Sequence, residues 1–331
     1  MPLRPRLLLA LCAAALAAAP AASAAPKRVL FFTKSSGFEH SVIRRHAGKP
    51  SWAEQILAEL GPRHGLEFTF SKDGSLFTPE YLARFDAFMF FTSGDLLGKG
   101  RDGNPPMTPG GKAAFLDAIR RGKGFVGLHS ASDSFHTGET VDTNTSVPRT
   151  WRYRNDGDKA DPYIRMLGAE FICHGQQQPS YLRVVDPKFP GQQGIGEKLD
   201  LVEEWYSLTD FSSDLHVLHV LETAGMRDAG PATGAAPSKE NAPYYRPDFP
   251  ITWARRHGEG RVFYTALGHR EDVWTNPVFQ QMLFGALAWA VGNVDAAIPP
   301  TIRQVTPRAW ELPPVSPNAG GPARVRPAPA N

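Results

Sequence analysis

Cysteine is almost absent from this sequence. Among 331 residues only Cys12 and Cys173 occur, and Cys12 lies in an N-terminal segment that we expect to be removed. A mature chain with one cysteine can form no internal disulfide, so its stability must come from a packed core. A lone cysteine is more often a small buried hydrophobe than a nucleophile, which is how we interpret Cys173.

The sequence also lacks an excess of charge of either sign. Lysine and arginine total 36 against 33 aspartate and glutamate residues, a formal net charge of +3, and loss of Arg4 and Arg6 with the N-terminal segment lowers it further. No basic stripe with interleaved aromatic residues is present. Because binding to a phosphate backbone depends on such a stripe, we exclude nucleic acid as a partner.

The apolar run near the N-terminus is too short to cross a bilayer. It covers residues 7–19, follows Arg4 and Arg6, and precedes the small-residue stretch 22–24 (Ala-Ser-Ala). A basic start, a short apolar run and an A-x-A site are typical of a cleaved signal peptide, whereas the alternative, a membrane anchor, needs a longer run. We predict a signal peptide over residues 1–24, a periplasmic or secreted protein, and no membrane association after cleavage.

Glycine-rich nucleotide motifs are missing as well. The segment after the first expected strand, residues 34–38, matches neither G-x-G-x-x-G nor G-x-x-x-x-G-K-[ST]. We therefore expect no nucleotide cofactor. Nor does any closely spaced set of cysteines and histidines indicate a structural zinc site.

What the sequence does contain is an alternation of short apolar runs and helical patterns. Such alternation is typical of a parallel sheet with helices on both faces. We expect strands at 28–33, 66–70, 87–92, 124–128, 171–174, 182–185, 203–208, 216–221, 250–256 and 261–266, the last two forming a hairpin, and helices at 52–60, 79–85, 109–121 and from 277 onward. The prediction is one α/β domain over residues 25–296 with additional antiparallel strands, followed by a Pro/Ala-rich tail at 297–331.

Histidines stand at the ends of several expected strands. His40 follows the first strand, His129 the fourth, and His269 the second strand of the hairpin, while His174 and Glu204 lie in or beside strands of the second half. Ligands of open α/β sheets gather at the carboxyl ends of the strands, so these side chains can converge despite their separation in sequence. A single histidine there is more often a hydrogen-bonded structural residue, but several together indicate a metal site or a polar sugar site.

The turn at residues 127–131 has the sequence Gly-Leu-His-Ser-Ala. A strand that runs into a tight turn before a helix is the geometry of a nucleophile elbow, which makes a serine hydrolase with Ser130 as nucleophile one hypothesis. Ser130 is off-centre in the motif, however, and Ala131 replaces the glycine that lets such an elbow close. We therefore disfavour this hypothesis.

Several blocks of the sequence form a pattern when they are taken together. They lie at 37–40 (Gly-Phe-Glu-His), 122–131, 167–171 with His174, 203–206 (Glu-Glu-Trp-Tyr), 250–253 and 258–269. In this combination the chain resembles ThuA-like (trehalose-utilisation-like) proteins over residues 28–293. The resemblance implies a flavodoxin-like fold of the class I glutamine amidotransferase-like superfamily, with His129 at the place of the amidotransferase cysteine. Histidine cannot form a thioester, so amidotransfer is excluded.

The resemblance also connects the chain with the metabolism of trehalose and related sugars, including 3-keto sugars. On that basis we expect an enzyme that isomerises or cleaves oxidised glycosides, with a small-molecule sugar as its partner. The expected catalytic residues are His40, His129 and Glu204; the expected ligands of a divalent metal ion are His40, His129, His174 and His269; the expected sugar contacts are Lys34, Ser130, Trp205 and Tyr206. One alternative is a non-catalytic sugar-binding protein on an inactive amidotransferase-like scaffold, and another is an exported domain that binds a partner protein.

Overall fold

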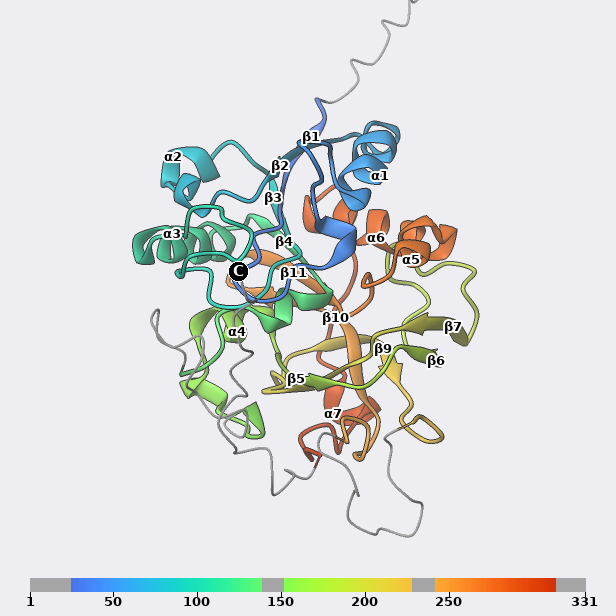
Figure 1. The fold of residues 1–331 in the computed structure, drawn as a ribbon. Coiled ribbons are helices and arrows are strands. Elements are labelled where there is room, and N and C mark those ends of the chain that lie inside the picture. Colours follow the sequence, from blue (N-terminus) through green and yellow to red (C-terminus); the bar gives the residue numbers. More distant parts are fainter. Residues whose placement is uncertain (1–24, 139–151, 228–241, 314–331) are drawn as a thin grey trace, which may run out of the picture.

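The computed structural model describes residues 25–138, 152–227 and 242–313 (Figure 1). The predicted signal peptide and the end of the Pro/Ala-rich tail lie outside the described residues. Within the described ranges, no helix combines the length and the apolar character needed to span a membrane.

A nine-stranded sheet runs through the middle of the molecule, in the order β2-β1-β3-β4-β11-β10-β9-β6-β7 (Figure 1). Its strands are β1 (Lys27–Phe32), β2 (Leu66–Ser71), β3 (Ala87–Phe90), β4 (Gly124–Leu128), β6 (Gln178–Val184), β7 (Lys198–Glu203), β9 (His216–Leu221), β10 (Phe249–His257) and β11 (Gly260–Thr265). The five strands from β2 to β11 are parallel, and every pair from β11 to β7 is antiparallel. The predicted flavodoxin-like α/β class with additional antiparallel strands is therefore confirmed.

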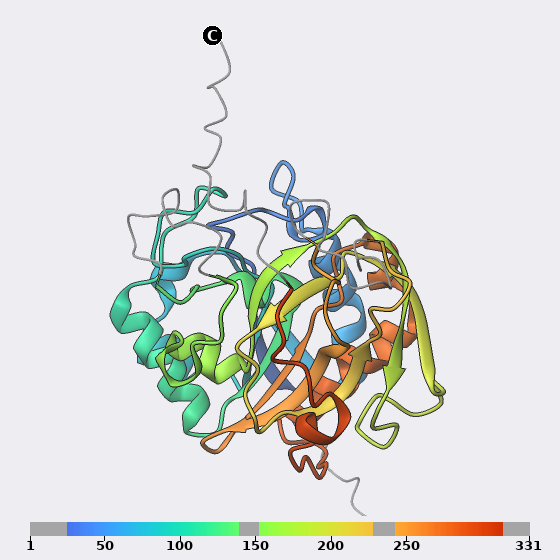
Figure 2. The same ribbon diagram turned by 90° about the horizontal axis from the view of Figure 1, so that it is seen from below.

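Helices cover both faces of the parallel part. Figures 1 and 2 show α1 (Trp52–Leu60), α5 (Glu271–Thr275) and α6 (Pro277–Ala290) on one side, and α2 (Pro79–Leu82), α3 (Pro109–Arg120) and α4 (Pro162–Leu167) on the other. Side chains accept a hydrogen bond from the first turn of five of these helices, at Ser51, Thr78, Thr108, Asp161 and Asn276. Such caps satisfy amide groups that the helix itself leaves unpaired, and they fix where each helix begins.

The core explains why the central strands are continuously apolar. The side chains Phe31 and Phe32 of β1 and Phe88 and Phe90 of β3 are fully buried, because a parallel sheet with helices on both faces exposes neither face to water. Burial of each such side chain contributes about 2–3 kcal/mol. This rigid block sets the positions of the strand ends, where the histidines lie.

The structure differs from the sequence prediction at residues 203–208, where two strands replace one. Strand β7 ends at Glu203 in the large sheet, and β8 (Tyr206–Thr209) pairs with β5 (Glu170–His174) in a separate two-stranded sheet. The chain changes sheets at Glu204, so this residue lies in a bend rather than in a strand. The bend brings the carboxylate of Glu204 to the edge at which the parallel strands end.

The first part of the C-terminal tail lies against the domain. Residues Ile302–Val305 form α7, Ile302 is fully buried, and the hydroxyl of Thr301 accepts a hydrogen bond from the amide of Val217 in β9 at 2.9 Å. The guanidinium of Arg246 donates to the carbonyl of Ala309. The described part of the tail is therefore packed onto the antiparallel strands.

Candidate functional site

Four predicted side chains meet at the carboxyl edge of the sheet. His40 follows β1, His129 follows β4, Glu204 follows β7 and His269 follows β11. Each offers one nitrogen or oxygen, and these four atoms all lie within 4.8 Å of one another. We call this group the His40–His129–Glu204–His269 cluster. The rule that ligands gather at strand ends explains why residues so far apart in sequence come together.

His129 is the most enclosed member of the cluster. Its side chain is fully buried, and its backbone has a positive φ of 41°, an uncommon conformation for a residue other than glycine. Nδ1 donates a hydrogen bond to the carbonyl of Ala266 at 2.8 Å, so Nε2 carries no proton when the ring is neutral. Burial lowers the pKa of His129 despite the neighbouring Glu204. His129 therefore presents a bare nitrogen to the cluster.

His40 brings a second neutral imidazole ring to the cluster. Only 3% of the residue is exposed, and burial, followed by the two neighbouring histidines, lowers its pKa well below the ordinary value. Its ring meets those of His129 and His269 edge to face, with centroids 4.9 and 5.1 Å apart. Its Nδ1 is buried and has no hydrogen-bond partner in the described part of the chain. Such an orphan polar atom indicates a group that the chain alone does not supply.

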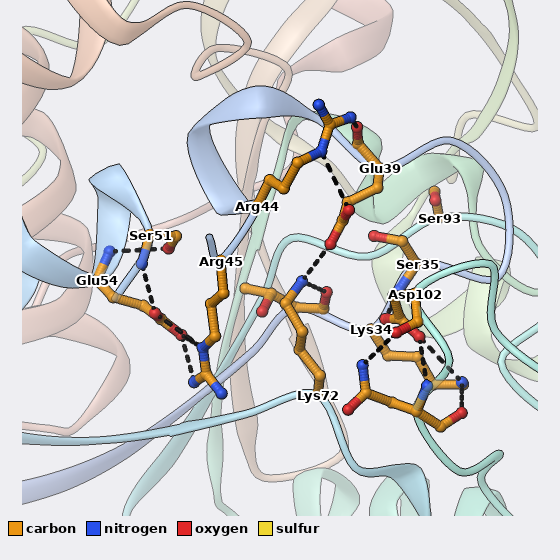
Figure 3. A network of polar contacts seen from close by, with 12 residues as sticks. Lys34, Ser35, Glu39, Arg44, Arg45, Ser51, Glu54, Lys72, Ser93 and Asp102 are labelled. Atoms are coloured by element: carbon orange, nitrogen blue, oxygen red, sulfur yellow. Dashed lines mark hydrogen bonds and ion pairs between the residues drawn. The ribbon is translucent and has the colours of Figure 1, made fainter. Parts of the chain in front are cut away.

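The loop that carries His40 is held by a polar network (Figure 3). Lys72 donates to the carbonyl of Thr33 at 2.9 Å and to the carboxylate of Glu39 at 3.0 Å, and Arg44 donates to the other oxygen of Glu39 at 3.2 Å. Ser93 adds a hydrogen bond to the carbonyl of Phe38 at 2.6 Å. These contacts fix the backbone on both sides of His40, so its ring enters the cluster from a rigid support.

A close approach of two glycines fixes the same loop from the other side. Gly94 has φ = +74°, and a Cβ built there would lie 2.4 Å from the backbone nitrogen of Gly37. Only glycine fits both the conformation and the gap. The end of β3 can therefore lie directly against the loop after β1.

The predicted sugar contact Lys34 lies at a different place. Its side chain is buried, donates to the carbonyl of Asn104 at 2.8 Å and lies 3.9 Å from the carboxylate of Asp102 (Figure 3). Asp102 also accepts a hydrogen bond from the amide of Ser35. Lys34 thus ties the loop after β3 to the end of β1, and the structure does not bring it to the histidine cluster.

Glu204 is the carboxylate of the cluster. Its Oε2 lies 3.5 Å from Nε2 of His129 and 3.2 Å from Nδ1 of His269, and its Oε1 lies 3.3 Å from Nδ1 of His174. Burial alone would raise the pKa of Glu204, but these imidazoles outweigh it and hold the pKa well below its usual range. Glu204 is therefore ionised at any physiological pH.

The neighbouring Glu203 has a structural role. It is fully buried, and its carboxylate accepts hydrogen bonds from the backbone amides of Gly268 at 2.6 Å, His269 at 2.9 Å and Glu204 at 2.9 Å. Burial raises its pKa to about 7 against the effect of these amides. Glu203 thus ties together the two chain segments that carry Glu204 and His269.

His174 and Tyr206 border the cluster. His174 is more exposed than its four neighbours, with 42% of its side chain accessible, and its Nδ1 donates to the carbonyl of Gly175 at 2.8 Å. The structure places it at the far oxygen of Glu204, outside the set of four converging atoms. The ring of Tyr206 packs on that of His129, with centroids 4.1 Å apart. Tyr206 therefore forms part of the wall that shields His129 from water.

The two remaining predicted sugar contacts are buried. Trp205 is 1% exposed and its indole nitrogen donates to the carbonyl of Gln178 at 2.9 Å, which makes it a core residue in this structure. Ser130 is fully buried beside His129, and its hydroxyl has no partner among the described residues.

Two residues near the cluster were not predicted from the sequence. The amide nitrogen of Gln177 lies 2.9 Å from Nε2 of His269, and Nη1 of Arg270 lies 2.7 Å from the amide oxygen of the same glutamine. Arg270 directly follows His269 in the chain, and Gln177 follows the strand that carries His174. Their positions next to predicted site residues were the signal that could have identified them.

The donor set fits a divalent cation. Ligands of a zinc ion, each about 2.1 Å from the metal, lie roughly 3–4 Å apart, which agrees with the 3.5 Å between Nε2 of His129 and Oε2 of Glu204. The bare Nε2 of His129, one ring nitrogen of His40 and the ionised carboxylate of Glu204 supply two nitrogens and one oxygen. Such a set suits Zn²⁺ or Fe²⁺ and leaves coordination positions open for substrate.

Crystal structures of two ThuA-like proteins are among those that resemble this fold. A ThuA-like protein from Bacteroides uniformis superposes with a TM-score of 0.55 at 21% identity, covering 85% of this chain and 97% of that one. A ThuA-like protein from Parabacteroides merdae gives 0.50 at 17% identity, covering 83% and 93%. No curated protein matches the sequence. At these identities the likeness concerns the fold alone.

The sequence itself matches a family model. The model ThuA, described as trehalose utilisation, matches residues 28–290, most of the predicted domain. The match covers the loops that carry His40, His129, Glu204 and His269, and it confirms the family predicted from the sequence blocks. The chain therefore belongs to the ThuA family.

Proposed function

We propose that this protein is an enzyme that isomerises or cleaves oxidised glycosides, with 3-keto sugars as the substrate class. The ThuA family implies a role in carbohydrate utilisation. The observation that supports catalysis is the bare nitrogen of His129 beside the ionised carboxylate of Glu204, 3.5 Å apart and largely buried. Titratable groups with strongly shifted pKa values in one place are typical of catalytic sites, whereas simple binding of a neutral sugar does not need them.

The chemistry follows from the ketone. A carbonyl at C3 acidifies the hydrogen on C2, and a base that removes this proton leaves an enolate. The electron pair then either takes up a proton at another position, which is isomerisation, or forms the C1=C2 bond while the glycosidic oxygen leaves C1 with its bonding pair, which is cleavage. Both routes need a base and a stabilised enolate oxygen.

The cluster and the bordering His174 can supply these roles. His129 and His174 each donate Nδ1–H to a backbone carbonyl, so their Nε2 atoms are free to accept a proton. Glu204 stays ionised and lies 3.5 Å or less from both rings, so it stabilises the positive charge that either ring gains.

A divalent cation would be held by His40, His129 and Glu204. When bound, it would polarise the ketone oxygen of the substrate. His174 would then remain as the base, since His129 would be occupied.

An apolar surface for the sugar ring lies at the same place. Phe38 is 59% exposed, and its ring contacts that of His40 edge to face at a centroid distance of 5.0 Å. Its carbonyl is held by Ser93, so the ring stands on a fixed backbone. Aromatic rings supply large apolar contact area at little cost in conformational entropy. We also propose that export, directed by residues 1–24, places this activity in the periplasm or outside the cell.

Turnover of a keto-glycoside tests the proposal. Purified protein supplied with Zn²⁺, Mn²⁺, Fe²⁺ or Ni²⁺ should consume methyl 3-keto-α-glucoside or 3-keto-trehalose in an NMR assay that detects isomerisation and cleavage alike. His129→Ala should lower the rate by at least about 100-fold, because it removes the enclosed bare nitrogen. His46→Ala, at an exposed turn outside the cluster, should retain the wild-type rate. No consumption of either compound by the wild-type protein with any of these metals would refute the proposal.

A further inference from the structure

The two nitrogens of His269 face different surroundings. Nδ1 lies 3.2 Å from Oε2 of Glu204 and 3.2 Å from Nε2 of His129, so it faces the cluster. Nε2 lies 2.9 Å from the side-chain nitrogen of Gln177, on the exposed side. A neutral imidazole carries one proton, and the nitrogen that holds it decides whether His269 offers the cluster a lone pair or an N–H group.

Arg270 determines how the amide of Gln177 is oriented. A guanidinium has donors only, so the atom of Gln177 that lies 2.7 Å from Nη1 of Arg270 must be the amide oxygen. The amide nitrogen, which is a donor only, is then the atom that faces Nε2 of His269. Nε2 must accept this hydrogen bond, and the proton of the neutral ring is left on Nδ1.

The arginine is itself fixed. Its Nε and Nη2 donate to the two carboxylate oxygens of Asp272 at 2.9 Å each. This two-point contact sets the plane of the guanidinium and directs Nη1 at Gln177. On the other side of His269, the carboxylate of Glu203 holds the backbone amides of Gly268 and His269. Both the backbone and the outer nitrogen of the ring are therefore positioned.

The surroundings of Nδ1 agree with a proton on that atom. Glu204 is an ionised acceptor, and Nε2 of His129 is bare because Nδ1 of His129 donates to Ala266. An unprotonated Nδ1 on His269 would face two acceptors with no hydrogen between them. The three rings are thus not equivalent: His40 and His129 offer nitrogens as acceptors or ligands, and His269 offers a hydrogen.

We propose that Gln177 and Arg270 are positioning residues that keep the proton on Nδ1 of His269, so that His269 serves as a hydrogen-bond donor to Glu204 and not as a metal ligand. A bound cation would then be held by His40, His129 and Glu204, and His269 would orient the carboxylate through its hydrogen bond to Oε2. If the proposed function holds, the same N–H is the group in the cluster that can give a proton to an enolate oxygen.

Nitrogen-15 NMR of the histidine side chains in metal-free protein tests the inference directly. At a pH above the pKa of His269, which burial alone would lower but Glu204 raises, the ring is neutral and the wild-type spectrum should show protonated Nδ1 and unprotonated Nε2. In Gln177→Glu, one carboxylate oxygen can accept from Arg270 while the other accepts from His269, so Nε2 should become protonated. Gln176→Glu is the matched control. It introduces the same negative charge one residue away, and Gln176 contacts Arg227 rather than His269. Its His269 signals should equal those of the wild type.

Two outcomes would overturn the inference: a neutral His269 ring with its proton on Nε2 in the metal-free wild-type protein, or the same His269 pattern in Gln177→Glu as in the wild type. Addition of Zn²⁺ gives a second test, because the signals of His129 should shift while His269 keeps its Nδ1 proton. Loss of that proton would make His269 a ligand after all. These spectra need no substrate, so absence of keto-sugar turnover would refute the proposed function and leave the tautomer assignment standing.

Discussion

Glu204→Gln is expected to reduce turnover of a 3-keto glycoside by about 1,000-fold or more. Glu204 is the carboxylate on which three imidazoles converge, at 3.5, 3.2 and 3.3 Å for His129, His269 and His174. Glutamine has nearly the same shape but no charge, so it cannot stabilise a protonated imidazole, and its amide nitrogen cannot accept the hydrogen bond from Nδ1 of His269. The loss combines a missing partner for the charged imidazole, which amounts to about 100-fold or more, with a weaker cation site, which amounts to about 10-fold or more.

The control for this substitution is Glu271→Gln. Glu271 is an exposed residue whose carboxylate accepts a hydrogen bond from Ser41, next to His40 in sequence, and it does not belong to the cluster. The same loss of charge there should change kcat less than threefold. Retention of a tenth or more of the wild-type kcat by Glu204→Gln would show that this carboxylate has no central part in the reaction.

The second large effect concerns the pH dependence of stability. His136 is buried between two carboxylates, with Nδ1 2.8 Å from Glu170 and Nε2 2.6 Å from Asp133, and Arg152 also contacts Asp133. Burial and Arg152 lower the pKa of His136, but the two carboxylates outweigh them and raise it to about 9. The folded state therefore binds a proton here that the unfolded chain releases near its ordinary value of 6.5.

The sign of the effect follows from this difference. A histidine with a raised pKa stabilises the folded state fully below about pH 6.5, and this contribution is lost as the pH rises through about 9. The full difference corresponds to roughly 3 kcal/mol. Urea unfolding at pH 6 and pH 9.5 should show a loss of this order in the free energy of unfolding.

His136→Gln should remove most of this pH dependence. It should also lower the stability at pH 6, because Asp133 and Glu170 would face a neutral side chain. His46→Gln, at an exposed turn, is the control and should keep the wild-type slope. An equal slope between pH 6 and 9.5 in His136→Gln and the wild-type protein would contradict the assignment of the charge to this ring.

The convergence of the histidines could be predicted because it depends on topology. Buried apolar runs identified β1 and β4, and the hairpin identified β11. Since the carboxyl ends of parallel strands share one edge, the segments that follow them were expected to lie near one another. His40, His129 and His269 follow from this rule alone. Glu204 needed the family resemblance, because its bend between β7 and β8 leaves no signal in the apolar pattern.

Side-chain direction could not be predicted in the same way. Lys34 lies within a few residues of His40, yet it points to Asn104 and Asp102 because the loop after β3 offers a carbonyl and a carboxylate there. Trp205 adjoins Glu204 in sequence, but the change of sheet turns its indole into the core, where it donates to Gln178. Such directions depend on which loops pack together, and a single sequence does not show this.

The most direct test of the account is the metal content of the protein, measured by elemental mass spectrometry on untagged material purified without chelator. We expect near-stoichiometric Zn, Mn, Fe or Ni in the wild-type protein and its loss in His129→Ala, because His129 presents the enclosed bare nitrogen of the cluster. Absence of metal from the wild-type protein, also after incubation with each of these ions, would contradict a metal-assisted reaction at this site. Equal metal content in both proteins would contradict the role of His129.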